Sequence, residues 1–355
     1  MLPTSENVTL PEPVSAFLSA LTADLRHKRV RRARITPLLN RAPLAEIVAR
    51  RKHLFLEATC DETPWGMWLS FRRRIRPTAE YPQGRVVQGR FAMLAVNDHL
   101  CLLVSTLARD AHNCGPHLLC KRSYPLAKRP FFPSSLLSRT ITDMAAKNAW
   151  TAMATDAMGY DRSRRFRRDM REQPIEDAVA EMLVQERYVH RLEVTFADAS
   201  SAQVLRAAFD RYACVSVRRG PILPIVSQFI SPAIREAVSQ AATYNVQLSA
   251  KSAHQHAVQL TFVNEPFRNR ADMNALCDSM RKGDGLAVTV IHLNPYLQAQ
   301  VIDMLSGRAA DMIVMDRARV SLVPRSQDCD LALERMTTTL FRHFGEAQVA
   351  KVPVV

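Results

Sequence analysis

The first apolar positions of the chain recur every three or four residues, which is the spacing of one face of an amphipathic helix. These positions are Val14, Phe17, Leu18, Leu21 and Leu25. They predict a helix over residues 13–34, which Pro37 ends. Similar patterns predict a second helix over residues 43–54 and a long helix over residues 134–159, with a proline-punctuated, irregular segment over residues 108–133.

Between residues 65 and 107 the apolar positions alternate with polar ones, as they do along a half-buried strand. One side of the first strand carries Met67, Leu69 and Phe71, and the other side carries Trp68, Ser70, Arg72, Arg74 and Arg76. Further strands are predicted over residues 85–96 and 99–107, joined by a turn at Asn97-Asp98. The pattern therefore predicts an antiparallel meander whose first strand has a basic and aromatic face.

Short apolar runs alternate with helical patterns in the second half of the chain. The predicted strands lie near residues 192–196, 213–218, 245–250, 258–262, 286–293, 311–315, 318–323 and 347–354, and the predicted helices near 200–211, 232–243, 271–281, 295–305 and 327–343. Such alternation favours a mixed or mainly parallel sheet covered by helices. The run 192–196 is echoed 66 residues later by the run 258–262, which is either a chance similarity or the mark of a duplicated βαβαβ unit.

Together these patterns predict a mixed α+β and α/β fold in two domains. The first is a basic α+β domain over residues 1–171, with helices and the antiparallel meander. A linker with a short acidic helix, opened by Pro174, follows over residues 172–188. The second is a near-neutral α/β domain over residues 189–355. A chain of 355 residues with 47% hydrophobic content is long enough to bury two cores.

The net charge of the chain is concentrated in its first half. Residues 1–171 carry a net charge of +15 and residues 172–355 a net charge of −1, which together make the +14 of the whole chain. Arginine outnumbers lysine by about the same ratio in both halves, so we attribute that preference to a GC-rich genome rather than to a function. A domain with this excess of positive charge repels itself unless a polyanion or solvent takes up the charge.

Three basic stretches in the first half are candidate nucleic-acid contacts. They are Trp68, Arg72, Arg74 and Arg76 on the predicted strand, Lys121, Arg122, Lys128 and Arg129 in the irregular segment, and Arg164, Arg165 and Arg168 near the end of the first half. Alternate side chains on one strand face lie about 7 Å apart, which is close to the phosphate spacing of a single strand, and a tryptophan beside them can stack on a base. Each stretch is also compatible with a solvated face, an anionic membrane surface or a contact for an acidic protein partner.

Histidines and cysteines suggest two further kinds of site. His112, Cys114, His117 and Cys120 place four candidate zinc ligands in nine residues, although their spacing matches no standard zinc motif. The alternative is a loop with cysteines turned inward. His254 and His256 share one face of a predicted strand and are candidates for acid–base catalysis, the alternative being a pair of surface histidines. The motifs of P-loop nucleotide binding, serine hydrolysis and zinc proteolysis are absent from the sequence.

The leading interpretation is a non-enzymatic, cytoplasmic nucleic-acid-binding protein, for RNA or DNA, with no cofactor other than a candidate zinc ion. Its first half would grip the phosphate backbone, and its second half would serve self-association or a partner contact, as in a homo-oligomer or complex subunit. The first alternative is a structural subunit of a nucleocapsid-like, defence or secretion assembly, and the second is a nucleic-acid-processing enzyme. Seven scattered cysteines favour a reducing compartment, cytoplasmic or of nucleoid or nuclear type, and the sequence has neither a secretory signal nor an apolar run long enough to span a membrane.

Overall fold

The computed structural model describes residues 9–75, 77, 82–131, 133–161, 164–185, 187–244, 256–283, 285–293 and 296–353. The chain forms two compact units. Unit 1 comprises Met1–Ala157, Arg168–Ala178 and Arg191–Arg235, and unit 2 comprises Met158–Arg167, Val179–His190 and Glu236–Val355. The segment Arg191–Arg235 belongs to the unit that contains the N-terminal half, whereas the sequence analysis assigns it to the second domain.

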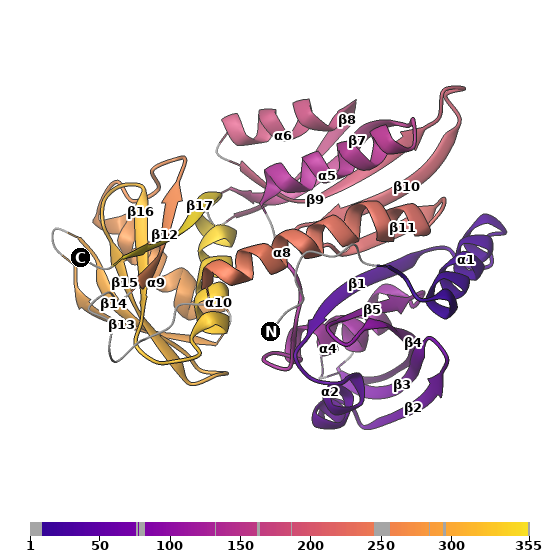
Figure 1. The fold of residues 1–355 in the computed structure, drawn as a ribbon, viewed down its shortest axis with the longest axis horizontal. Coiled ribbons are helices and arrows are strands. Elements are labelled where there is room, and N and C mark those ends of the chain that lie inside the picture. Colours follow the sequence, from indigo (N-terminus) through magenta and orange to yellow (C-terminus); the bar gives the residue numbers. More distant parts are fainter. Residues whose placement is uncertain are drawn as a thin grey trace. The chain divides into compact units, whose positions relative to one another are not determined.

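The first sheet has the strand order β2-β3-β4-β5-β1-β11-β10-β9-β7-β8 (Figure 1). The short β6 also pairs with β1. The strands of this sheet are β1 (Ala33–Asn40), β2 (Glu57–Thr63), β3 (Gly66–Ile75), β4 (Arg85–Asn97), β5 (Leu100–Ser105), β6 (Ala127–Lys128), β7 (Thr151–Asp161), β8 (Arg164–Pro174), β9 (Arg187–Ala197), β10 (Gln203–Asp210) and β11 (Val215–Arg219). The helical segments that accompany them in the chain are α1 (Glu12–Arg26), α2 (Leu44–Arg51), a 3₁₀ turn (Lys52–Leu54), α3 (Arg109–Cys114), α4 (Pro116–Arg122), α5 (Ser134–Lys147), α6 (Ile175–Val184), α7 (Leu223–Ile225), a π-helical segment (Val226–Ile230) and α8 (Ser231–Tyr244).

The predicted meander is confirmed as β3, β4 and β5, which pair antiparallel in that order. The side chains of Met67, Leu69 and Phe71 are buried in one core with residues of α2 and α4, as the alternation predicts. The backbone N–H of His99 donates to Asn97 Oδ1 across the predicted turn (2.9 Å). The alternating pattern thus determined both the strands and the face that they bury.

The first helix is shorter than predicted, and a strand follows it. Helix α1 ends at Arg26, and residues 33–40 form β1, which pairs with β5 on one side. On its other side β1 pairs with β11 through residues 33–35 and with β6 through residues 39–40. Pro37 lies between these two ladders, where its missing N–H is tolerated. The proline that predicts a helix end therefore sits inside a strand of the sheet.

The long helix predicted over residues 134–159 is also corrected. Helix α5 ends at Lys147, and residues 151–161 form β7, followed by β8 in the basic run that the sequence presents as a linker. Gly159 does not cap a helix, because it lies in β7. A Cβ at this position would collide with the carbonyl oxygen of Tyr188 on β9. The close approach of two strand backbones explains this glycine better than a helix end does.

Strand β10 replaces the helix predicted over residues 200–211. Its residues Leu205, Ala207 and Phe209 are buried with a period of two. Phe209 contacts Phe196 of β9 and Phe229 of the π-helical segment through edge-to-face ring contacts. The gain from burying these rings outweighs the helical preference of the alanines in this segment.

Unit 2 contains the second sheet, with the strand order β13-β14-β15-β16-β12-β17. The elements are β12 (His256–Phe262), α9 (Arg270–Gly283), β13 (Leu286–His292), β14 (Gln298–Asp303), β15 (Arg308–Val314), β16 (Arg319–Pro324), α10 (Asp330–Phe344) and β17 (Ala347–Pro353). Helix α10 packs against α9 and also contacts strands β12 and β15. Aromatic contacts join Phe262, Phe267 and Phe341 in the core of this unit.

Strands and helices combine in the predicted α+β manner, but the prediction of a mixed or mainly parallel sheet in the second half is wrong. All the registered strand pairs of unit 2 are antiparallel. Strand β14 occupies most of the helix predicted over residues 295–305. With β10 and β14 as strands, neither half has the predicted βαβαβ order, and the duplication stays a hypothesis. The strand predicted over residues 245–250 lies outside the described residues.

Candidate nucleic-acid interface

The predicted basic face of β3 has acidic neighbours that the sequence analysis missed. Strand β2 pairs with β3 and places Glu57 opposite Arg72. Arg72 Nη1 donates to Glu57 Oε1 over 2.6 Å. Arg74 is exposed at the next position on this face, and Arg76 lies outside the described residues. The surplus of positive charge on this face is therefore smaller than the sequence of β3 alone suggests.

Trp68 is already engaged within unit 1. Its ring contacts Trp65 and Phe17 of α1, with centroid separations of 5.3 and 5.9 Å. The guanidinium of Arg90 lies 4.7 Å from the centre of the Trp68 ring and also donates to Asp61 Oδ2 of β2 over 2.7 Å. Stacking on a base would require the ring to exchange these partners.

The second predicted stretch divides into exposed and enclosed residues. Lys121 and Arg122 are exposed at the end of α4, whereas Lys128 is buried in β6. The Arg129 guanidinium lies 4.0 Å from the centre of the Tyr212 ring, and Tyr212 contacts Phe131 at a centroid separation of 5.2 Å. This placement suits Lys128 and Arg129 to packing rather than to contact with a phosphate.

Asp210 provides the counter-charge for Arg129. Burial alone would lower the pKa of Arg129, but Tyr212, Cys214, Cys120 and Asp210 outweigh that effect and raise it. Asp210 Oδ1 also accepts hydrogen bonds from the backbone N–H groups of Tyr212 (2.8 Å) and Cys214 (3.0 Å) in the turn between β10 and β11. The charge of Arg129 is thus balanced by groups within unit 1.

The third predicted stretch lies on β8. Arg165 is exposed and belongs to unit 2, whereas Arg168 is half-buried and belongs to unit 1. Arg164 begins the strand, and its side chain lies outside the description. The stretch is therefore a strand whose basic residues are divided between the two units.

The candidate zinc ligands are distributed over two helices that meet at Gly115. The rings of His112 and His117 lie 6.4 Å apart between centroids. Cys120 is buried, and burial raises the pKa of its thiol to about 12. Among the residues that the structure describes, no three histidine, cysteine or acidic side chains are grouped to hold a metal ion. His256 begins β12 opposite Pro353, and His254 lies outside the described residues.

A larger group of arginines lies on the first sheet, where the sequence analysis did not place a site. We call it the sheet-face arginine cluster, and it consists of Arg32, Arg34, Arg191, Arg206 and Arg218. The strand register aligns Arg34 with Ser216, Ser216 with Ala208, and Ala208 with Glu193. Arg191 stands two positions from Glu193, and so lies on the same face. The β10–β11 register is irregular between Arg206 and Ala207, but Arg206 and Arg218 both contact Glu193, which places them on this face as well.

The opposite face of the same strands holds a buried apolar row. Ile35, Val215, Phe209 and Leu192 are paired across the four strands and are almost completely buried. Burial of this row fixes which face each strand turns toward the core, because a shift of one residue would exchange the two faces. The core therefore directs the arginines to a common surface.

Glu193 is the acidic side chain that bridges this cluster. Its Oε1 accepts from Arg206 Nε over 3.0 Å, and its Oε2 accepts from Arg218 Nη2 over 3.1 Å. Glu193 has only 12% of its side chain exposed, whereas the two arginines are about 40% exposed. One carboxylate thus holds two guanidinium groups and leaves their outer edges toward solvent.

The remaining arginines of the cluster repel one another. The pKa of Arg34 is lowered to about 10 by burial and by the charges of Arg32, Arg191 and Arg109. The pKa of Arg32 is lowered by burial and by Arg218 and Arg191, with Glu193 acting in the opposite direction. Arg34 is held in place by donation from its Nη1 to the carbonyl oxygen of Leu107 (2.7 Å). An anion placed here would relieve this repulsion.

Sequence reasoning missed this cluster for two reasons. Arg191, Arg206 and Arg218 come from the half of the chain with almost no net charge, and the helical spacing places Arg32 and Arg34 at the end of the predicted first helix. Alternation of Leu192, Val194 and Phe196 with polar residues was the available signal, because it predicts that Arg191 and Glu193 share the outer face.

We found no protein family, curated protein or solved structure that matches this chain. Within the described part of the chain, no helix combines the length and apolar character needed to cross a membrane.

Proposed function

We propose that this protein binds nucleic acid through the phosphate backbone, with the sheet-face arginine cluster as the contact surface. The observation that carries the proposal is that five arginines from four separate segments meet on one face, where Glu193 bridges two of them and Asp210 is paired across the strands with Arg191. A phosphate backbone provides a row of anions that guanidinium groups bind in a bidentate manner.

The nature of the surface favours contact with the backbone over chemistry on it. Its side chains are mainly guanidinium groups, and the carboxylates beside them are already engaged: Glu193 is shared by Arg206 and Arg218, and Asp210 accepts from two backbone N–H groups. Fixed cations of this kind position a polyanion without providing a nucleophile or a general base. The proposal is therefore a binding function, and it relocates the contact from the predicted β3 face to β1 and β9–β11.

The test compares two charge reversals of equal size. Fluorescence anisotropy with a labelled single-stranded 20-nucleotide DNA, its RNA counterpart and a duplex, over a series of salt concentrations, measures affinity and salt dependence. We expect Arg32→Glu with Arg191→Glu to reduce affinity for the preferred probe about 100-fold at low salt, and to reduce the log–log salt slope by about 1.4 to 1.8. The matched control, Arg72→Glu with Arg74→Glu, is expected to change affinity by less than about threefold.

Three other results of the binding experiment would contradict the proposal. A larger loss in the Arg72 and Arg74 variant would return the interface to β3. Equal losses would show that affinity follows total charge rather than the cluster. An unmodified protein that binds none of the three probes at low salt would remove the nucleic-acid function. Circular dichroism of every variant confirms that the fold is retained, and Arg32→Gln provides a milder change in the same direction.

A further inference from the structure

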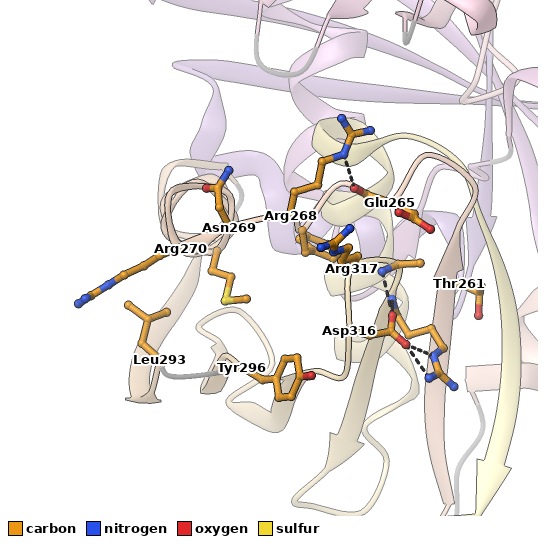
Figure 2. Close-up of a pocket in the computed structure, with 13 residues that line it drawn as sticks. Thr261, Glu265, Arg268, Asn269, Arg270, Leu293, Tyr296, Asp316 and Arg317 are labelled. Atoms are coloured by element: carbon orange, nitrogen blue, oxygen red, sulfur yellow. Dashed lines mark hydrogen bonds and ion pairs between the residues drawn. The ribbon is translucent and has the colours of Figure 1, made fainter.

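Unit 2 contains a cleft of about 830 Å³ at one end of its sheet. The cleft is built by the segment between β12 and α9, the hairpin between β15 and β16, and the residues on either side of the β13–β14 connection (Figure 2). Its volume lies within the range of small-molecule sites. The cleft belongs entirely to unit 2 and is independent of the sheet-face arginine cluster.

Backbone contacts hold the walls of the cleft together. The N–H of Phe267 donates to the carbonyl oxygen of Arg317 (3.0 Å), and the N–H of Phe262 donates to that of Ala318 (2.9 Å). The ring of Phe267 is buried between Phe262 and Phe344, with centroid separations of 5.5 and 5.3 Å. The segment after β12 is thereby fixed to the β15–β16 hairpin, and the cleft is formed before any ligand arrives.

The charge of the lining is positive. Four arginines, at positions 268, 270, 317 and 319, face two carboxylates, those of Glu265 and Asp316. Asp316 is committed to its own hairpin: it accepts from Arg319 Nε over 2.5 Å and from the backbone N–H groups of Ala318 (2.9 Å) and Arg319 (2.8 Å). Burial would raise the pKa of Asp316, but these hydrogen bonds outweigh it and lower that pKa, so the carboxylate stays charged.

The other arginines differ in their direction and partners. Figure 2 shows Arg270 turned away from the other labelled side chains, and Arg317 between Arg268 and Asp316. Arg268 donates to the carbonyl oxygens of Glu265 and Asn264, each over 3.1 Å, and these bonds position its guanidinium group. Arg317 is exposed, and its side chain makes no hydrogen bond or ion pair with the residues that the structure describes. Arg317 is thus the cation that an anion in the cleft would meet, with Arg268 beside it in the lining.

An apolar and aromatic side stands opposite these cations. The ring of Tyr296 is 50% exposed, and Leu293 and the buried Met273 line the cleft beside it. A half-exposed tyrosine next to apolar side chains is a surface on which a flat ring can stack. The N-terminus of α9 adds no site of its own, because Asn269 and Asp272 already accept from its first N–H groups and from those just before it.

We propose that this cleft binds a nucleoside phosphate, with the phosphate on Arg317 and Arg268 and the base against Tyr296. The two halves of the ligand match the two sides of the cleft: one is anionic, and the other is flat and largely apolar. The exposed carboxylate of Glu265 is an acceptor for a ribose hydroxyl or an exocyclic amine. This site would bind a nucleotide whether or not the sheet-face arginine cluster binds a strand.

Isothermal titration of the full chain tests the proposal with four ribonucleoside 5′-monophosphates, their nucleosides and inorganic phosphate as probes. We expect at least one nucleotide to bind with a Kd below about 1 mM, and about tenfold more tightly than its nucleoside or phosphate alone. Arg317→Ala should weaken that nucleotide about tenfold. Tyr296→Leu should weaken the nucleotide about fivefold and leave the affinity for phosphate unchanged.

The matched control is Arg308→Ala. Arg308 begins β15, the strand whose other end reaches the cleft, and its exposed ion pair with Asp328 is long (3.7 Å). We expect this variant to bind the nucleotide within about twofold of the unmodified protein, since exposed pairs contribute little. Three results would overturn the proposal: no binding of any nucleotide at 1 mM (about the weakest affinity that a specific site needs), phosphate bound as tightly as the nucleotides, or equal effects of the Arg317 and Arg308 substitutions.

Discussion

The outer face of β3 and the sheet-face arginine cluster are both rich in arginine, but they differ in what lies across the strands from those arginines. Arg72 and Arg90 each meet a separate carboxylate on β2. In the cluster, Arg206 and Arg218 share Glu193, and Arg32 and Arg34 lie among other arginines. The number of arginines in a stretch of sequence is thus a poor guide to its positive potential, because cross-strand neighbours decide how much charge is left.

Arg129 represents a third arrangement, in which an arginine is enclosed within unit 1. Arg129 is enclosed by Tyr212 and balanced by Asp210, so its charge serves the core. The three regions range from an arginine used for packing, through arginines paired at the surface, to arginines held together by the fold. Removing the acidic or titratable partner in each region separates these roles.

The largest effect is expected at Asp210. Asp210→Ala removes two backbone hydrogen bonds and the counter-charge of Arg129, and should lower the free energy of unfolding by about 3 kcal/mol in urea denaturation. Asp198→Ala is the matched control, because Asp198 accepts from Ser200 and Ala202 N–H groups in the preceding turn but is only partly buried. Asp198→Ala should lower the free energy of unfolding by clearly less than Asp210→Ala does. An equal loss in both variants would show that the turn, and not the balance of Arg129, is what Asp210 stabilises.

The next effect is a loss of stability in acid caused by His112, whose pKa depends in part on Arg34 of the cluster. Burial, followed by the charges of Arg34 and His117, lowers the pKa of His112 to about 3. Since the folded pKa is depressed below the unfolded value near 6.5, this histidine destabilises the fold as pH falls below about 6.5. Its contribution between pH 7 and pH 5 is a loss of about 2 kcal/mol.

Urea denaturation at these two pH values measures that loss, and His112→Asn should reduce it. Arg34→Gln should reduce it partly, because it removes one of the charges that keep His112 neutral. Identical pH dependence in the unmodified protein and in His112→Asn would mean that the acid sensitivity arises elsewhere.

The smallest effect distinguishes the two surface regions directly. Glu193→Gln should lower the free energy of unfolding by about 1 kcal/mol, because two arginines lose a shared partner, yet strengthen nucleic-acid binding and steepen its salt dependence. Glu57→Gln on β2 should change stability by less than about 0.5 kcal/mol, because its pair with Arg72 is exposed, and should leave binding unchanged. For both variants, fluorescence anisotropy measures binding and urea denaturation measures the free energy of unfolding. A stronger gain in binding from Glu57→Gln would reverse the comparison.

The periodicity of the sequence was sufficient for elements whose own residues decide their conformation. The meander at residues 66–105 follows from alternation, and α9 and α10 follow from helical spacing near the predicted limits. Periodicity failed at residues 203–210 and 298–303, where small and polar residues permit a helix and the neighbouring strands provide a better partner. It also failed at Pro37, whose strand is permitted by a gap between two ladders that no local pattern reveals.

The sequence by itself determined the balance of charge, the alternating faces of the first strands and the general combination of helices with strands. Only the tertiary structure decided which charges meet. Glu57 and Arg72 are brought together by pairing of β2 with β3, and Arg34 and Arg218 by pairing of β1 with β11. Paired strands lie about 5 Å apart whatever their separation in the chain, and electrostatic interactions depend on distance in space. For that reason a chain whose two halves differ by sixteen charges places three of its five clustered arginines in the half that is nearly neutral.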